Sequence, residues 1–443
     1  MMRARGFDPM RSGTRFRLFP QSPFGGPTEP ETVRVSSLAG SLGPGPSDHR
    51  MYVVDPIERR QPYGLAQGRH GAPVLHLPPW IGPVAPPAMP GPGGHFDHLE
   101  IGTREFEAAH VFGTIRFVLD VWEGYFGRPI PWHFERHYRR LEIMLNRDLE
   151  NALAGYGFIE AGADTGTGTQ YRPFSLNFDV IAHEVGHLII YSEIGMPEIE
   201  IEAGEHFGFQ EAAADLIALI SVLQFDSVVD ELLENSHGNL YTFNKLNRFG
   251  ELSHNEQIRL ASNPLKLSDF VFGWYDEHDL AEPLIGAMFD ILVDVFHESL
   301  LDRKLISPEV EDLADRLERR PEYAPLIQLL FDEAYARDPA GFKEALLDAR
   351  DDLGLALAAT LGQLSPHGLS YEDIGEAMLA VDRASTAGRY QRLIVNNFRW
   401  REIGRAVGGP RLAPPTGVSH TFSARTLLPE DNSSLPGFDG RVR

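Results

Sequence analysis

Beyond the first hundred residues or so, apolar residues recur at helical spacing in several long segments. One of them, "FEAAHVFGTIRFVLDVWEGYF", begins at Phe106 and ends before Gly127. Apolar positions on almost every side of this segment predict a mostly buried helix. From Ser307 to about Ala406 nearly the whole sequence has helical periodicity. The pattern therefore predicts a largely helical C-terminal half.

Short runs with strand character follow the first of these helices. Residues 140–146 ("RLEIMLN") and 156–162 ("YGFIEAG") predict strands, and 161–170 ("AGADTGTGTQ") predicts a loop. The next segment, "FDVIAHEVGHLIIYSEIG", predicts a helix with Asp179 near its start and Gly195 just past its end. Further helices are expected over "FQEAAADLIALISVL" and "EPLIGAMFDILVDVFHESLL". Strands and helices in this order predict an α+β fold.

The first hundred residues differ in composition, because they are rich in Pro, Gly and Ser. Residues 78–94 read "PPWIGPVAPPAMPGPGG", and proline lacks a backbone donor, so this stretch cannot be a regular helix or a central strand. We interpret 1–100 as an arm, partly extended or disordered, that could lie over the folded body. We then expect an α+β lobe over 101–195, a helical lobe over 196–406 and a peripheral tail over 407–443.

The charge and the amino-acid composition of the chain limit the kinds of partner that it can bind. The chain has 443 residues and a formal net charge of −23, which disfavours nucleic acid and anionic membrane as partners. It has no cysteine, which excludes disulfides and cysteine-based zinc sites. We find no apolar run long enough for a membrane span and no Sec-type signal peptide. We therefore expect a cytoplasmic location by default, which leaves export by another route open.

The motif "HEVGH" contains His183, Glu184 and His187. On a helix, residues four apart lie on one face, so the two imidazoles can bind one Zn²⁺. Glu184 lies beside them and can act as general base on the attacking water. The helix is apolar on almost every side, and buried polar groups are costly unless they are paired. A metal ion would account for two histidines and a glutamate there.

A third protein ligand is expected on the following helix. The segment "FQEAAAD" contains Glu211, and Asp215 lies one turn later on the same face. A carboxylate at Asp215 could accept the second N–H of a ligating histidine and select its tautomer. Ala, Leu and Ile surround both acids in the sequence, which argues against a pair of solvated helix charges.

A second pair of histidines has the same spacing. His133 and His137 are four residues apart, but Arg136, Arg139 and Arg140 surround them. Positive charge disfavours a bound cation, so we interpret these two histidines as structural.

Together these motifs resemble the thermolysin-like gluzincin peptidases, from about Ala108 to Phe289. "DVIAHEVGH" is similar to the zinc-helix segment of that family. "QEAAAD" resembles its Asn-Glu-x-x-Ser-Asp segment, which implies Glu211 as third zinc ligand and Asp215 as its supporting carboxylate. The resemblance implies a two-lobe zincin fold, with a β-containing N-terminal lobe, a helical C-terminal lobe and the zinc helix between them. The calcium ligands of the family are not recognisable, which leaves calcium binding open.

Three further segments resemble the parts of these peptidases that contact substrate. "NALAGYGFIEAG" is similar to the edge-strand segment, which implies that Asn151 and Ala152 hold the substrate backbone. "IRLASNP" implies that Arg259 contacts a substrate carbonyl. "HDLAEPLIGAMF" implies that His278 stabilises the oxyanion of the tetrahedral intermediate. The usual tyrosine after the zinc helix has no clear match, and Tyr191 and Tyr275 are the candidates.

The resemblance predicts a zinc-dependent endopeptidase that acts on peptide or protein substrates. Two other interpretations stay open from the residues alone. A non-catalytic zinc protein could use the metal to tie the lobes together, although structural sites usually have four protein ligands. A latent gluzincin-fold protein could serve as an interaction module, with the Pro-rich arm as a plug in the cleft. The sequence leaves the oligomeric state open.

Overall fold

The computed structural model describes residues 12–24, 28–59, 61–67, 73–164, 171–196, 204–240, 261, 263–270, 277–316 and 320–404. Within these residues the fold is mixed α+β, as predicted. Its longest helices are α1 (Arg104–Phe126), α2 (Phe178–Glu193), α3 (Gly204–Val222), α8 (Glu277–Asp302), α11 (Pro339–Leu361) and α12 (Tyr371–Thr386). The shorter helices are α4 (Asp226–Ser236), α9 (Pro308–Asp315), α10 (Ala324–Arg337) and α13 (Gln391–Trp400), with 3-10 turns at Phe174–Leu176, Leu267–Phe270 and Pro321–Tyr323.

The largest sheet has four strands in the order β3-β6-β8-β7. They are β3 (Met51–Val54), β6 (Leu141–Leu145), β8 (Phe158–Ala161) and β7 (Ala152–Gly155). β3, β6 and β8 are parallel, and β7 is antiparallel to β8 at one end of the order. β7 is therefore an edge strand of this sheet.

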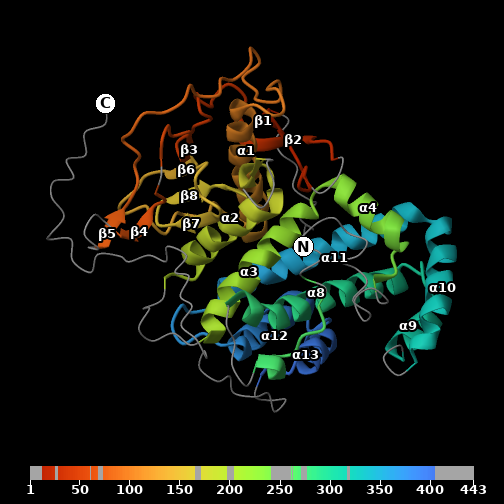
Figure 1. The fold of residues 1–443 in the computed structure, drawn as a ribbon. Coiled ribbons are helices and arrows are strands. Elements are labelled where there is room, and N and C mark those ends of the chain that lie inside the picture. The colour runs from red at the N-terminus through yellow and green to blue at the C-terminus, as the bar shows by residue number, and fades with distance from the viewer. Residues whose placement is uncertain are drawn as a thin grey trace.

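Three smaller pairs complete the strands. They are β1 (Gly13–Leu18) with β2 (Glu31–Leu38), β4 (Gly64–Gln67) with β5 (Pro73–His76), and β9 (Ala163–Asp164) with β10 (Arg172–Pro173). Figure 1 shows the strands gathered at one end of the molecule and most of the helices at the other, with α2 and α3 between them.

The described part of residues 1–100 belongs to the folded body, which corrects its interpretation as an arm. Phe16 and Leu18 of β1 are fully buried in the main core, and β3 pairs with β6 inside the four-stranded sheet. Gly113 of α1 allows this contact, because a Cβ there would lie 2.9 Å from side-chain atoms of both Phe16 and Leu18. Short alternating runs such as "RFRL" carry the strand signal, and the surrounding Pro and Gly obscured it. The predicted tail, 407–443, lies outside the described residues.

Several predicted elements are confirmed. α1 covers the first predicted helix, and β6 and β8 fall within the predicted strands. α2 begins after Asn177, whose side chain accepts hydrogen bonds from the N–H groups of Asp179 and Val180. It ends before Gly195, which has φ of +100°, a left-handed conformation that glycine adopts without strain. Both ends of the helix that carries "HEVGH" therefore have a local cause.

α2 and α3 approach each other closely at a glycine. A Cβ at Gly186 would lie 2.7 Å from the Cα of Ala214, so only glycine fits against α3 at this point. Four polar residues of the two helices, His183, His187, Glu211 and Asp215, lie within one turn of this contact. Close approach of the two backbones thus brings His183 and His187 of α2 toward Glu211 and Asp215 of α3.

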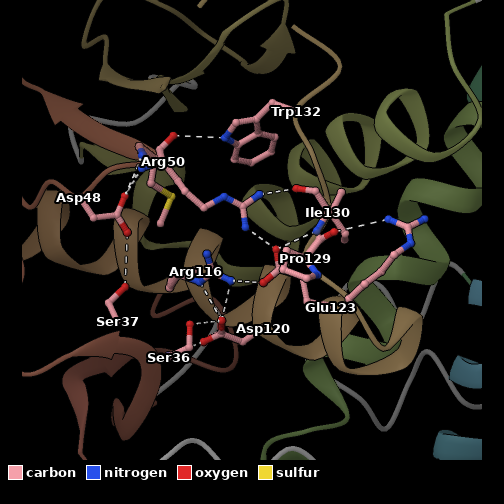
Figure 2. Close-up of polar contacts among 12 residues, drawn as sticks. Ser36, Ser37, Asp48, Arg50, Arg116, Asp120, Glu123, Pro129, Ile130 and Trp132 are labelled. Carbon is pink, nitrogen blue, oxygen red and sulfur yellow. Dashed lines mark hydrogen bonds and ion pairs between the residues drawn. The ribbon is translucent and has the colours of Figure 1, made fainter. Parts of the chain in front are cut away.

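An ionic network on α1 ties the sheet end of the molecule together (Figure 2). Arg116 forms ion pairs with Asp120 and Glu123, and Asp120 accepts hydrogen bonds from the backbone and side chain of Ser36 on β2. Arg50 forms an ion pair with Glu123. The network thereby anchors β2 and the start of β3 to one helix.

The helices at the other end pack around α3 and α8. The guanidinium of Arg401, just after α13, is buried against α8, where it forms an ion pair of 2.8 Å with Asp290. Among the described helices none is by itself long and apolar enough to cross a bilayer. Among these helices, only α3 and α4 taken together are long and apolar enough, and the pair is bent by 92° between the two helices.

Candidate metal centre

Three potential ligand atoms converge between α2 and α3. The Nε2 atoms of His183 and His187 lie 3.0 Å apart. Oε2 of Glu211 lies 3.2 Å from Nε2 of His183 and 3.5 Å from Nε2 of His187. Among the described residues this is the group of histidines and acids whose ligand atoms are close enough to hold one metal ion.

The spacing of these atoms fits a tetrahedral metal ion. Ligands at about 2.0–2.1 Å from zinc in tetrahedral geometry lie roughly 3.3–3.4 Å from one another. The observed distances between the three potential ligand atoms, 3.0, 3.2 and 3.5 Å, lie on both sides of that value. Two imidazole nitrogens and a carboxylate oxygen with their lone pairs directed at a common point need a proton or a cation between them. The donor set therefore fits a metal ion.

Asp215 orients the first of these histidines. Its carboxylate lies 2.6 Å from Nδ1 of His183, so it accepts the N–H at that nitrogen. The hydrogen bond leaves the lone pair on Nε2, where it is directed toward His187 and Glu211. Asp215 occupies the position that we expected from its place one turn after Glu211.

The charges of the centre shift the pKa values of its members. Burial acts to lower the pKa of His183, but Asp215 and then Glu211 raise that pKa well above the ordinary value of histidine. Burial acts to raise the pKa of Glu211, yet the neighbouring imidazoles hold that pKa well below the usual carboxyl value. Without a metal ion, His183 is therefore protonated beside an ionised Glu211. A bound cation would displace that proton, so metal affinity rises with pH.

Glu184 lies between the metal-ligating side of α2 and the edge strand. It is 9% exposed, and its carboxylate accepts a hydrogen bond from the backbone N–H of Ala154 on β7. Burial raises the pKa of Glu184, and His183 and His187 partly offset that rise. A carboxyl group whose pKa lies above its ordinary value accepts and releases protons closer to neutral pH.

His278 approaches the centre from a third element, the first turn of α8. Its Nε2 lies 3.2 Å from Oε2 of Glu211, and its ring centroid lies 6.4 Å from that of His183. The side chain is 63% exposed. The structure thus places both predicted catalytic residues close to the three potential ligands, with Glu184 buried and His278 exposed to solvent.

The predicted substrate-contacting residues have different positions. Ala152 begins β7, and the side chain of Asn151 accepts the N–H of Ala152 at 2.9 Å. A Cβ at Gly162 would overlap the backbone oxygens of Leu149 and Asn151, which explains the glycine that ends this hairpin. Arg259, like the candidate Tyr275, lies outside the described residues.

Sequence reasoning missed two contacts near the centre. One is the hydrogen bond between Ala154 and Glu184, which no side-chain pattern could reveal. The other is an aromatic contact between Tyr191, one turn beyond His187, and His133, whose ring centroids are 5.5 Å apart. Burial lowers the pKa of His133 to about 4, so this histidine is neutral and packs as an aromatic ring.

Comparison with models of known protein families and with curated protein sequences gives no match to this chain. The chemistry of the centre therefore follows from its own geometry.

Proposed function

We propose that the chain is a zinc-dependent endopeptidase with a thermolysin-like, two-lobe architecture. The observation that carries the proposal is the convergence of His183, His187 and Glu211 beside a buried glutamate that faces an edge strand. Two imidazoles and one carboxylate are the ligand set of catalytic zinc sites, which keep their fourth position for water or substrate. Oxygen-rich ligand sets would favour magnesium or calcium instead.

When bound, zinc would supply Lewis acidity at the scissile carbonyl and activate the attacking water molecule. Glu184 takes the proton of that water on its carboxylate and delivers it to the leaving amine nitrogen. Its hydrogen bond from the N–H of Ala154 holds the carboxylate between α2 and β7. Proton transfer of this kind contributes typically 10²–10⁴-fold to the rate.

The edge strand β7 supplies the backbone groups that bind an extended peptide. An exposed strand edge takes up a peptide as an added strand, and backbone hydrogen bonds then provide affinity. Asn151 and Ala152 lie at the start of β7. By the family resemblance they hold the substrate backbone and Arg259 contacts a substrate carbonyl.

His278 stabilises the oxyanion in this proposal. Its place in the first turn of α8, 3.2 Å from Glu211, supports a role at the reacting carbonyl. The strand-bearing end of the molecule and the helical end then form the two lobes, with α2 at their junction.

The test combines metal analysis with turnover of an unfolded protein such as casein. We expect about one zinc per chain and hydrolysis that a chelator abolishes and added zinc restores. His187→Ala should lose the metal, whereas an exposed histidine outside the centre, replaced as His367→Ala, should not. Full zinc occupancy without turnover would favour the non-catalytic zinc protein, and full occupancy in His187→Ala would exclude this ligand set.

A further inference from the structure

We propose that Arg136, His137 and Arg139 form a recognition surface for acidic residues of a peptide bound along β7. This inference rests on the proposed function, because it names the class of substrate that the same site would select. All three side chains are exposed, and they lie in the segment between α1 and β6.

The surface lies at the end of the edge strand. Tyr156 directly follows β7, and its hydroxyl lies 2.5 Å from Nδ1 of His137. Tyr138 packs against the same tyrosine ring, with centroids 5.9 Å apart. The positive charge of Arg136 acts on Tyr156 as well, because it partly offsets the rise in the pKa of Tyr156 that burial causes. A peptide that extends β7 would therefore run past Arg136 and His137.

The same segment reaches the metal-binding helix. The ring of His133 contacts both Tyr156 and Tyr191, each with a centroid separation of 5.5 Å. Tyr191 follows His187 by one turn of α2, which corresponds to about 6 Å along the helix axis. One row of aromatic rings thus connects the metal-binding helix, the end of β7 and the arginine-bearing segment.

Charge gives this surface its specificity. The chain has a net charge of −23, yet residues 136–140 carry three arginines and no acid. No carboxylate among the described residues forms an ion pair with Arg136, Arg139 or Arg140, although Glu135 precedes them in sequence. The guanidinium of Arg140 lies over the ring of Tyr52 on the far strand β3, so Arg136 and Arg139 are the arginines left for a ligand. A guanidinium binds a carboxylate through paired hydrogen bonds.

The base of the segment is held in place before any ligand binds (Figure 2). The side chain of Arg50 donates to the backbone oxygen of Ile130, and the side chain of Glu123 accepts the N–H of Ile130 at 3.1 Å. The indole of Trp132 donates to the backbone oxygen of Arg50 at 3.2 Å. A fixed segment loses less conformational entropy when it binds a ligand.

The position of the surface also predicts where the acidic residue lies in the substrate. Tyr156 lies two positions after Ala154, which contacts Glu184, and a strand rises about 3.3 Å per residue. The acidic residue should therefore lie about two to four residues from the scissile bond. It should lie on one side of that bond only, because the surface occupies one end of β7. A patch of this size suits a few carboxylates better than the phosphates of a nucleic acid, which the net charge repels.

The experiment measures binding in Glu184→Gln, so that the peptide stays intact. Fluorescent nonapeptides carry Asp or Asn at single positions on either side of the centre, and fluorescence anisotropy gives each Kd. We expect Asp to bind about three- to tenfold more tightly than Asn on one side only, as for two exposed ion pairs. High salt should reduce that preference by screening. Arg136→Gln combined with Arg139→Gln should bring it below about twofold.

The control is Arg392→Gln, which changes an arginine on α13 that is 73% exposed and should leave the preference intact. Equal Kd values for the Asp and Asn peptides, or a preference that survives in the double variant, would overturn the inference. A single-stranded oligonucleotide can also be tested as a competitor of the peptide. If it displaces the peptide from the wild-type surface but not from the double variant, the inference is overturned in favour of a nucleic-acid ligand. Failure of the proposed function would give a different result. The wild type would then hydrolyse no peptide, while the preference for Asp in the binding assay would persist.

Discussion

The molecule contains two buried polar clusters near β7 and β8, and their hydrogen bonding differs. The α2–α3 cluster consists of the polar residues of the metal centre, His183, Glu184, His187, Glu211 and Asp215. The sheet cluster lies around β3, β6 and β8 and consists of Tyr52, Arg59, Tyr63, Glu142 and Glu160. Both contain acids that are almost inaccessible to solvent.

In the sheet cluster, donors face acceptors. Glu142 accepts hydrogen bonds from the hydroxyls of Tyr52 and Tyr63, each at 2.5 Å, and from the N–H of Trp80. Glu160 forms an ion pair with Arg59. Each acid of this cluster thus has a donor without any added ion, and the cluster fastens the segment before β4 onto the sheet.

In the α2–α3 cluster, Nε2 of His183, Nε2 of His187 and Oε2 of Glu211 share one point, so once the imidazoles are neutral acceptors face acceptors there. Buried charge alone is therefore a poor guide to function in this molecule. The direction of the lone pairs separates a structural cluster from a ligand site.

The largest expected effect is the loss of turnover in Glu184→Gln. The amide is nearly isosteric but cannot accept the proton, so kcat should fall by about 10²–10⁴-fold. Zinc content and the unfolding midpoint should stay close to wild type. Glu142→Gln, the same change in the sheet cluster, should leave kcat unaltered. A Glu184→Gln protein that keeps more than about a tenth of kcat would remove Glu184 as general base.

Breaking the sheet cluster should affect stability instead. Arg59→Met leaves Glu160 without its ion-pair partner in a buried site, which should lower the free energy of unfolding by about 3 kcal/mol. Urea unfolding measures the change, and zinc content should not respond. As a control, Arg320→Met removes an exposed pair with Glu322 and should cost less than about 1 kcal/mol. Similar losses for both variants would contradict the assignment of Arg59.

Asp215→Asn tests how far the α2–α3 cluster depends on a correctly oriented imidazole. The amide can present its N–H to Nδ1 of His183 and favour the wrong tautomer, so zinc affinity should fall by about 10–100-fold. In the wild type, affinity should decrease as pH falls through the raised pKa of His183, because the proton competes with the metal. Competition with a chromophoric chelator at several pH values gives both quantities. Unchanged affinity in Asp215→Asn would show that zinc binding does not depend on the tautomer that Asp215 selects.

His278→Ala should have a smaller effect. An oxyanion contact acts in the transition state, so kcat should fall with KM little changed. Because the side chain is 63% exposed, we expect a loss of about tenfold, below the value for an enclosed donor. Wild-type kcat in this variant would make His278 a bystander and direct attention to another group.

The smallest effect concerns the pH dependence of stability. Burial raises the pKa of Glu160 from 4.5 to about 7, against the opposing charge of Arg59. The folded state therefore holds this proton more tightly than the unfolded chain, so the contribution of Glu160 is fully present below pH 4.5 and is lost as pH rises toward about 7. Urea midpoints across this window should decrease more steeply for the wild type than for Glu160→Gln. Parallel profiles would show that Glu160 does not titrate there.

Much of the candidate site could be predicted from the sequence, because its chemistry depends on helical spacing. His183, Glu184 and His187 lie on one helix whose caps, Asn177 and Gly195, are also local in sequence. The N-terminal strands could not be recognised in the same way. Their short alternating runs lie among Pro and Gly, and their pairing depends on contacts with α1 and β6, which are far away in sequence.

The sequence by itself determined the α+β character, the helix that carries "HEVGH" and the residue types that could bind a metal. Only the tertiary structure decided that Glu211 and Asp215 meet this helix, since that depends on the contact between Gly186 and Ala214. It likewise decided that β7 is the edge strand beside Glu184. The spacing of residues along a helix follows from local backbone geometry. Whether the lone pairs of side chains on different elements point to one place depends on how those elements pack against each other.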